Sequence, residues 1–594
     1  KAKKLIEART LEGQLSLAFI AFREGELNKA EKIFKRLIKI NKKESGKKDP
    51  WLLDTLGLIY WWQDKNDKAR PLIQEAFDIQ EKLYGSNNPR LIQPLINIAM
   101  VHFKDKEYEK ADYYLRRSLE IQFRRIQEEV IYLPIAIRNN FVKTLGISYA
   151  AIFTASDIHP EGRNLALFAR LNRHGLLEEI EKKQSQLASL SGPHQPLLNE
   201  IKRITNKLSN RTNVNPELRA TLNQRKANLE RQLYQVLPGI EARITKVSDV
   251  ANVLPNNSIL IEFQKYRRFE PEKPTDAINQ KNWGASRYQA LILTPEGETS
   301  GVNLGLAAPI DQKIRKALNA SEKKLVEAQQ LWKEVSDLII KPLSKEVEGK
   351  QVIFISPDGE LNRIPFSALS STTGEELLVD VVKLRLLTTG RELLDLAYES
   401  NQTLQQSLVL ANPDFNYNQD WPGKRRSDLI SSTQSQQRSG DLDSWNWSSL
   451  PGTAKEGKII AKFTNAQLLT EEKATALAIQ EQNFVPKVLH IASHAYFLSN
   501  KEKSKNELQA ALIANPNTSL FSLSENPLLR SGIVMAGANQ PDSNPEDDGY
   551  LTALEVAKLD WQGTEMVVIS GCESGKGDIQ SGEGVYGLKR AIAV

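Results

Sequence analysis

The chain has 594 residues, with 79 lysines and arginines against 73 aspartates and glutamates, and a formal net charge of +6. At about 150 residues per domain, this length predicts roughly three to five domains. Hydrophobic residues make up 40% and charged residues 26%, which excludes a fully disordered chain. No apolar run reaches the roughly 18 residues that a membrane span needs, and the small positive excess gives no reason to expect direct nucleic-acid binding.

Cysteine and histidine are scarce. Cys572 is the only cysteine, and there are six histidines. A single thiol forms no intramolecular disulfide, and a zinc site built from several cysteines is excluded. We therefore expect a cytoplasmic protein without metal or cofactor.

The first 125 residues show a repeated helical pattern. Alanines follow short polar turns at three positions, 39 and 42 residues apart: Ala30, Ala69 and Ala111. A small residue stands twelve positions before each of them: Ala18, Gly57 and Ala99. Because small residues let two helices approach closely, the spacing predicts paired-helix repeats, which resemble a long variety of the tetratricopeptide repeat. An unrelated helical bundle is the alternative.

The helical character continues from residue 126 to residue 250. Residues 126–160 are apolar at helical spacing, and residues 161–248 are rich in Leu, Gln, Lys, Glu and Arg, with breaks at 191–193 and around 213–216. We interpret this region as a helical extension followed by a long antiparallel helical hairpin. Its alternating charges indicate a solvated face rather than a binding patch.

From residue 251 to residue 594, short runs typical of strands alternate with helical ones. The predicted strands are 258–263, 288–293, 351–355, 407–410, 488–491 and 566–569, and the predicted helices are 322–347, 390–398, 454–463, 474–480 and 552–556. This alternation predicts a mostly parallel sheet flanked by helices, so the fold class is α followed by α/β. The polar run 416–449 predicts a mobile loop.

Two of the predicted strands end at reactive side chains. Strand 488–491 leads to His494, and strand 566–569 leads to Cys572. Reactive groups collect at the carboxyl ends of parallel strands, so we expect an imidazole base beside a thiol nucleophile. Gly571 and Gly575 would leave backbone N–H groups free for an oxyanion. The alternatives are a small buried cysteine and a structural histidine.

Nine short segments in collinear order carry a family resemblance. They are ISPDG (355–359), IPFSAL (364–369), ANP (411–413), LPGT (450–453), LHIASH (489–494), GIVMAGAN (532–539), DGYLTA (548–553), SGCESG (570–575) and GEGV (582–585). The stretch from about residue 253 to residue 594 thereby resembles the CHAT peptidases, a caspase-like family often found behind tetratricopeptide repeats. The resemblance and the repeats together cover nearly the whole chain.

The resemblance implies a cysteine endopeptidase of the caspase/separase type. Cys572 matches the nucleophile and His494 the base, and the N–H groups of Cys572 and Ala495 would form the oxyanion hole. The family usually has glycine where this chain has Ala495, and a positive φ is costly for alanine. The family also continues with further strands beyond the position of Val594. We therefore expect a C-terminally truncated domain, and the start at Lys1 points to a trimmed beginning.

Substrate preference has two acidic candidates. Related caspase-like peptidases select Lys or Arg through an acidic pocket, to which Asp358 or Asp548 would contribute. The alternative for Asp358 is the turn residue of a Pro-Asp-Gly sequence. The basic residues 424–426 are either a self-cleavage site or a solvated cluster.

The repeats are expected to regulate activity, because stacked helix pairs form a surface that binds a protein or peptide. The alternatives are a catalytically inactive scaffold and other thiol chemistry such as acyl transfer. Family members act in bacterial immunity and in cell differentiation, so the resemblance implies nucleic acid only as an indirect partner.

Three rival motifs fail. His490 and His494 have zinc spacing for a helix, but on a strand they are roughly 13 Å apart. Gly582, Gly584 and Gly587 match a dinucleotide motif that here does not directly follow a strand. Residues 571–577 fall one residue short of a P-loop and lack Ser or Thr after the lysine.

Overall fold

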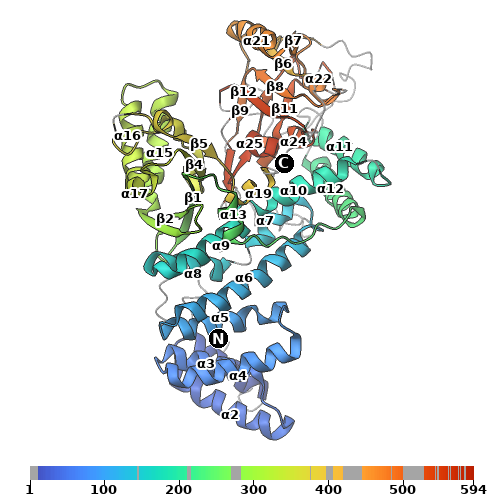
Figure 1. The fold of residues 1–594 in the computed structure, drawn as a ribbon. Helices are drawn as coiled ribbons and strands as arrows, with labels where there is room; N and C mark the ends of the chain where they lie inside the picture. The colour runs from blue at the N-terminus through green and yellow to red at the C-terminus, as the bar shows by residue number, and fades with distance from the viewer. Residues whose placement is uncertain are drawn as a thin grey trace. The chain divides into compact units, whose positions relative to one another are not determined.

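The computed structural model (Figure 1) describes most of the chain. The described residues are 11–143, 146–190, 192–209, 216–268, 283–374, 376–396, 406–418, 445–482, 484–498, 527–541, 543–544, 547–559, 561, 563–572, 574, 577–580 and 584–593. The chain divides into two compact units. The first unit comprises residues 1–128, 142–174 and 242–397, and the second comprises residues 129–141, 175–241 and 398–594.

The first unit begins with six helices joined in succession by short turns. They are α1 (Leu11–Arg23), α2 (Leu27–Ser45), α3 (Pro50–Trp62), α4 (Asn66–Tyr84), α5 (Ile92–Lys104) and α6 (Tyr108–Val130). Ala30, Ala69 and Ala111 are all buried. A Cβ on Gly57 would come within 2.5 Å of Ile73 Cγ1, so the glycine permits the close approach of α3 and α4. The predicted paired-helix repeats are confirmed.

A five-stranded mixed sheet forms the rest of the first unit. Its strands run in the order β3 (Thr299–Leu306), β2 (Ser286–Leu293), β1 (Ser258–Arg267), β4 (Val352–Ser356) and β5 (Lys383–Leu386). β1, β4 and β5 are parallel, whereas β2 pairs antiparallel with both β1 and β3. The helices of this part are α8 (Gly146–Ile158), α9 (Arg163–Arg173), α13 (Val247–Val253), α15 (Ala307–Glu322), α16 (Ala328–Ile339), α17 (Ser344–Val347), α18 (Leu378–Val381) and α19 (Leu393–Leu396).

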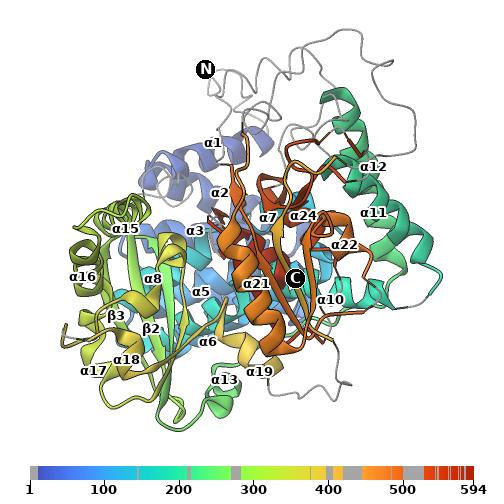
Figure 2. The same cartoon turned by 90° about the horizontal axis from the view of Figure 1, so that it is seen from above.

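The two faces of β1 differ in chemistry. Ile259, Ile261 and Phe263 belong to an apolar core to which α15 and α16 contribute. The alternate residues Glu262 and Gln264 contact side chains of α9 and α8 instead. Figure 2 shows α15 and α16 on one side of β2 and β3 and α8 on the other. The sheet is therefore covered on both faces, with polar contacts concentrated under α8 and α9.

The second unit contains a four-stranded sheet that is parallel throughout. Its order is β12 (Met566–Ser570), β8 (Val488–Ala492), β6 (Leu408–Pro413) and β7 (Gln467–Glu471). Helix α21 (Pro451–Thr464) packs on one face, where Gly457 approaches Ala411. The apolar core on the other face includes residues of α22 (Ala476–Gln480), α24 (Ala553–Val556) and α25 (Leu588–Ala593). This is the predicted parallel sheet flanked by helices.

Smaller elements complete the second unit. β9 (Ala495–Phe497), β10 (Ser531–Val534) and β11 (Tyr550–Thr552) form an antiparallel sheet, and β13 (Gly577–Gln580) pairs with β14 (Gly584–Gly587). The remaining helices are α7 (Ile135–Lys143), α10 (Leu176–Ser189), α11 (Gln195–Ser209) and α12 (Pro216–Val236). Short 3-10 turns, such as Pro527–Arg530, connect several of these elements.

The structure corrects three expectations. All six predicted strands are present, but they are shared between two sheets in two units, because a strand's sequence does not reveal its neighbour. The predicted hairpin of residues 161–248 is four helices, of which α9 lies in the first unit and α10 to α12 in the second. The predicted helix 322–347 is broken into α16, a 3-10 turn and α17. The domain boundaries at residues 125 and 250 stay predictions.

Part of the expected mobile loop 416–449 lies outside the described residues. These are residues 419–444, and with them the basic cluster 424–426. Gly575 and Gly582 are also outside. Residues 445–449 are described, and they pack into the second unit through Trp447.

Candidate active site

The strands that lead to His494 and Cys572 are neighbours in the parallel sheet of the second unit. Ser570 at the end of β12 faces Ala492 at the end of β8. Beyond this pair the two chains stay together, because Ser493 N donates to Ser570 O at 3.2 Å. His494 and Cys572 each follow two residues after the last paired position. The structure therefore brings the two predicted strand ends to one edge of the sheet.

Gly571 holds the two strand ends in close contact. A Cβ at this position would lie 2.7 Å from Ser493 O and 3.3 Å from Ala495 Cβ. Such approaches leave no space for a side chain, so glycine is required by packing rather than by a positive φ. The next residue, Cys572, is exposed and carries a free thiol. The cysteine is thus anchored beside the loop that carries His494 while its sulfur remains accessible.

Ala495 begins β9 and directs its N–H away from β10. Val534 N donates to His494 O at 2.8 Å, and Ala495 faces Ile533 as the next pair. Hydrogen-bonded and non-bonded pairs alternate in an antiparallel ladder, so the Ala495 N–H points out of the sheet. Its nitrogen lies 3.4 Å from a Cβ built on Gly571. Ala495 does not have a positive φ, so the expected conformational cost of alanine does not arise.

The imidazole of His494 is held by a backbone carbonyl and two aromatic rings. Its Nε2 lies 2.9 Å from Ser448 O. A carbonyl oxygen only accepts, so Nε2 is the donor, and in the neutral form of the ring Nδ1 is the nitrogen with the lone pair. The rings of Phe415 and Trp447 lie 5.3 and 5.1 Å from the imidazole centre. This arrangement selects the tautomer in which Nδ1 is free to act as a base.

Trp447 is itself fixed by hydrogen bonds. Its backbone N donates to Asn539 Oδ1 at 2.9 Å, and its indole Nε1 donates to the hydroxyl of Tyr550 at 2.9 Å. Asn539 Nδ2 donates in turn to Trp447 O at 3.0 Å. The residues that orient His494 were not predictable from the motifs around Cys572 and His494. The available signal was the pair Trp445 and Trp447 in an otherwise polar segment.

His490 has a structural environment. It lies on β8, is buried, and places Nε2 2.9 Å from Glu456 Oε1 of α21. This contact joins the sheet to the helix that covers it. The described residues contain no group of three or more His, Cys, Asp or Glu side chains arranged to hold a metal ion.

The two acidic pocket candidates lie in different units. Asp358, in the first unit, is 1% exposed and accepts hydrogen bonds from Lys265 N, Gly359 N and Gln264 Nε2. These are the contacts of a residue that stabilises a turn, and they favour that alternative. Asp548, in the second unit, is 6% exposed, and its Oδ1 accepts from Tyr550 N at 3.1 Å. A pocket role stays a prediction for both.

Asp548 belongs to a buried acidic group with Glu555. Glu555 caps α24, where its Oε2 accepts from the N and Oγ1 of Thr552, both at 2.8 Å. Burial raises the pKa of Glu555 to about 8, and the negative charges of Asp548 and Asp547 add to this effect. The carboxyl of Glu555 is therefore protonated in the folded protein at neutral pH.

Glu555→Gln is expected to remove a pH dependence of stability. The pKa of Glu555 in the folded protein lies above the ordinary value of 4.5. The contribution of this carboxyl to the free energy of unfolding is therefore complete below about pH 4.5 and is lost as the pH rises through about 8. Between pH 5 and 8 the free energy of unfolding of the wild type should fall by about 1.4 kcal/mol per pH unit relative to that of Glu555→Gln. Urea unfolding at pH 5, 6.5 and 8 measures this difference. Glu565→Gln, at an exposed carboxylate, is the control. If the free energy of unfolding changes with pH in the same way for the wild type and both variants, the prediction is wrong.

Two protein-family models match the chain, and the longer match includes residues of both compact units. The model of the CHAT domain matches residues 328–594, and a tetratricopeptide-repeat model matches residues 51–122. No protein of curated function matches significantly. None of the described helices is both long and apolar enough to cross a bilayer.

Several solved structures also match part of the chain. BtubC (BKLC) from P. vanneervenii is 18% identical over 38% of this chain and 75% of its own, with a TM-score of 0.21. A putative kinesin light chain with nearly identical TPR-like repeats from Podosopora anserina is 18% identical over 38% of this chain and 90% of its own, also with a TM-score of 0.21. The assignment of the repeats rests on the family match and on the helix pairs themselves.

Proposed function

This chain belongs to the proteins that join tetratricopeptide repeats to a CHAT domain, which has a caspase-like fold, and we propose that it is a cysteine endopeptidase of the caspase/separase type. One observation carries the proposal. The carboxyl ends of the parallel strands β8 and β12 are in close contact through Gly571 and Ser493. Cys572 and His494 each follow two residues beyond the last paired residues, at the same edge of the sheet. A free, exposed thiol two residues past the end of β12, and an imidazole two residues past the end of β8, suit nucleophilic catalysis.

The reaction proceeds through an acyl-enzyme. Nδ1 of His494 takes the proton of the Cys572 thiol, and the thiolate attacks the carbonyl carbon of the substrate. The N–H groups of Ala495 and Cys572 bind the oxyanion. The imidazolium then donates its proton to the leaving amine, and the neutral imidazole activates water for deacylation. The carbonyl of Ser448 keeps the ring oriented, as the third member of a triad does.

Recognition of a basic side chain is assigned to Asp548. It lies in the same unit as the proposed dyad, and its negative charge contributes to the raised pKa of Glu555. The repeats bind a regulatory protein or peptide, which is the usual role of stacked helix pairs. A reducing, cytoplasmic location keeps Cys572 in the thiol form that the reaction requires.

Comparing the wild type with Cys572→Ala and His494→Ala tests the proposal. Each protein is incubated with a peptide library that contains Lys, Arg and neutral residues, and new termini are mapped by mass spectrometry. We expect new termini only with the wild type, and His494-dependent labelling of Cys572 by an electrophilic peptide. The same termini from all three proteins would exclude this chemistry. Cys572 labelling that does not depend on His494 would favour the inactive scaffold.

Trp447→Ala is expected to lower kcat by about 10- to 100-fold with little change in KM, because the ring packs against the imidazole of the proposed base. Trp447→Phe keeps an aromatic contact and is expected to recover most of the activity. Trp445→Ala is the control, since Trp445 is exposed and makes an edge-to-face contact with Trp447 rather than a contact with His494. Steady-state kinetics over a pH range provides the measurement. Equal losses for the two alanine variants would show that Trp447 does not position the histidine.

A further inference from the structure

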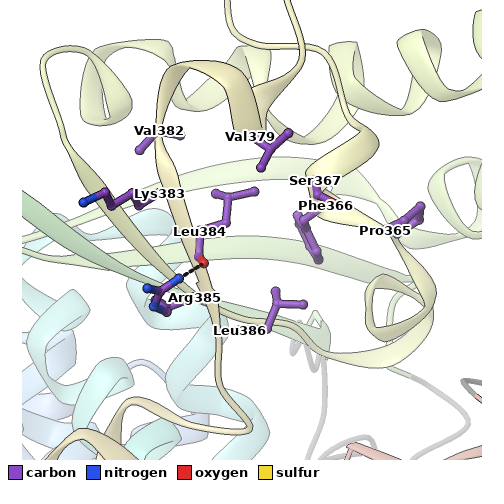
Figure 3. Close-up of a pocket in the computed structure, with 9 residues that line it drawn as sticks. All are labelled: Pro365, Phe366, Ser367, Val379, Val382, Lys383, Leu384, Arg385 and Leu386. Atoms are coloured by element: carbon purple, nitrogen blue, oxygen red, sulfur yellow. Dashed lines mark hydrogen bonds between the residues drawn. The ribbon is translucent and has the colours of Figure 1, made fainter. Parts of the chain in front are cut away.

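The outer edge of β5 in the first unit combines an open strand with an apolar hollow. β5 is the last strand of the five-stranded sheet, and no described strand pairs with its outer side. Beside it lies a hollow of about 380 Å³ (Figure 3). Residues from three neighbouring segments line it: Pro365, Phe366, Ser367, Val379, Val382, Lys383, Leu384, Arg385 and Leu386.

The backbone of β5 presents free hydrogen-bonding groups along this edge. Lys383 N donates to Gln351 O, and Leu387 N donates to Ile355 O, so the odd-numbered residues bond to β4. The backbone N–H and C=O groups of Leu384 and Leu386 therefore point away from β4, as parallel pairing requires. The side chain of Arg385 covers one of them, because its Nη1 donates to Leu384 O at 3.1 Å. An incoming strand would take over this carbonyl and release the guanidinium.

The side chains of β5 alternate between charged and apolar. Figure 3 shows Lys383 and Arg385 on the opposite side of the strand from Leu384 and Leu386. Leu386 is 50% exposed, and Val379 on the rim of the hollow is 47% exposed. Lys383 and Arg385 are the only charged residues among those that border the hollow, and both are basic. Asp380 of α18 is exposed nearby but does not line it.

We propose that the β5 edge binds an extended segment of a partner protein in which acidic and apolar side chains alternate. Residues that face each other on paired strands share one side of the sheet, so acidic groups meet Lys383 and Arg385 while apolar groups enter the hollow beside Leu384 and Leu386. A second copy of this chain fits poorly, since antiparallel pairing of two β5 edges sets basic residues against basic residues. The proposal does not depend on peptidase activity.

Fluorescence anisotropy with labelled hexapeptides and the 594-residue chain carrying Cys572→Ala tests the proposal. The probe alternates Glu and Val, and the comparison peptides are the block sequence of three Glu and three Val and the alternating probe N-methylated at every second amide. We expect the alternating peptide to bind at least ~10-fold more tightly than either one, since only it offers both strand hydrogen bonds and matched side chains. Equal binding of all three peptides, or none, would overturn the proposal.

Charge reversal separates this edge from other basic surfaces. Lys383→Glu with Arg385→Glu is expected to weaken the alternating peptide at least ~10-fold. Lys316→Glu with Lys323→Glu makes the same change in net charge at exposed positions of the same unit and should leave binding unchanged. Circular dichroism confirms that both variants fold. Equal weakening by the two double variants, or concentration-dependent dimerisation abolished by Arg385→Glu, would show that the β5 edge does not receive such a partner.

Discussion

Gly571→Ala is expected to lower kcat/KM by about 100-fold, although the substitution adds only a single methyl group to the residue before Cys572. The added Cβ would lie 2.7 Å from Ser493 O, a backbone atom that has no flexible side chain to move aside. The end of β12 must therefore shift away from the loop that carries His494. A displacement near 1 Å between a nucleophile and its base is enough for a loss of this size.

Gly452→Ala is the matched control for this prediction. Gly452 lies in the first turn of α21 in the same unit, and a Cβ there would meet no atom within 4 Å. Kinetics with a cleaved peptide, combined with thermal unfolding of both variants, separates misplacement from global instability. Full activity in Gly571→Ala would mean that the contact between the two strand ends does not position Cys572.

The sequence predicted those features that depend on local periodicity. Ala30, Ala69 and Ala111 marked the repeats because a close helix pair requires a small residue at a fixed offset, and all three are buried. The strands that lead to His494 and Cys572 were identified from their apolar runs, and the structure pairs them in parallel. Their meeting was predictable because an α/β pattern brings carboxyl ends of strands to one edge.

Features that depend on contacts distant in sequence were missed. The carbonyl that orients His494 belongs to Ser448, 46 positions earlier, and any residue type supplies a backbone carbonyl. The short strands β5, β9, β10 and β11 have three or four residues each, too few for a period to be evident. The division of the strands between two sheets was also hidden, because apolar strands of both sheets have similar sequences.

Arg170→Met is expected to lower the free energy of unfolding of the first unit by about 3–5 kcal/mol, since it leaves buried negative charge without a partner. Arg170 on α9 and Glu262 on β1 are both fully buried, and Nε donates to Oε2 at 2.9 Å. The guanidinium also donates from Nη2 to Ser356 Oγ at 3.0 Å and to Pro357 O at 3.1 Å. Removing it affects the sheet and the loop that follows β4 together.

His174 strengthens this network as an acceptor. Burial lowers the pKa of its imidazole well below the ordinary value, and the positive charges of Arg170 and Arg173 lower it further. The neutral ring accepts from Arg170 Nη1 through Nδ1. Glu262 in turn accepts from Gly390 N at 2.6 Å. The cation therefore connects α9 with β1 and with the loop that follows β4, and its partner Glu262 extends the network to Gly390.

Urea unfolding of four proteins tests this reasoning: the wild type, Arg170→Met, Glu262→Gln and the double variant. Because neutral glutamine removes the unpaired charge, the double variant should be more stable than the sum of the single losses predicts. Arg203→Met is the control, since Arg203 pairs with Glu200 at the same 2.9 Å but with the arginine 60% exposed. A surface pair contributes about 1 kcal/mol or less. If Arg170→Met and Arg203→Met lower the free energy of unfolding equally, burial does not set the strength of the Arg170–Glu262 ion pair. In that case α9 is held to the sheet by its apolar side chains instead.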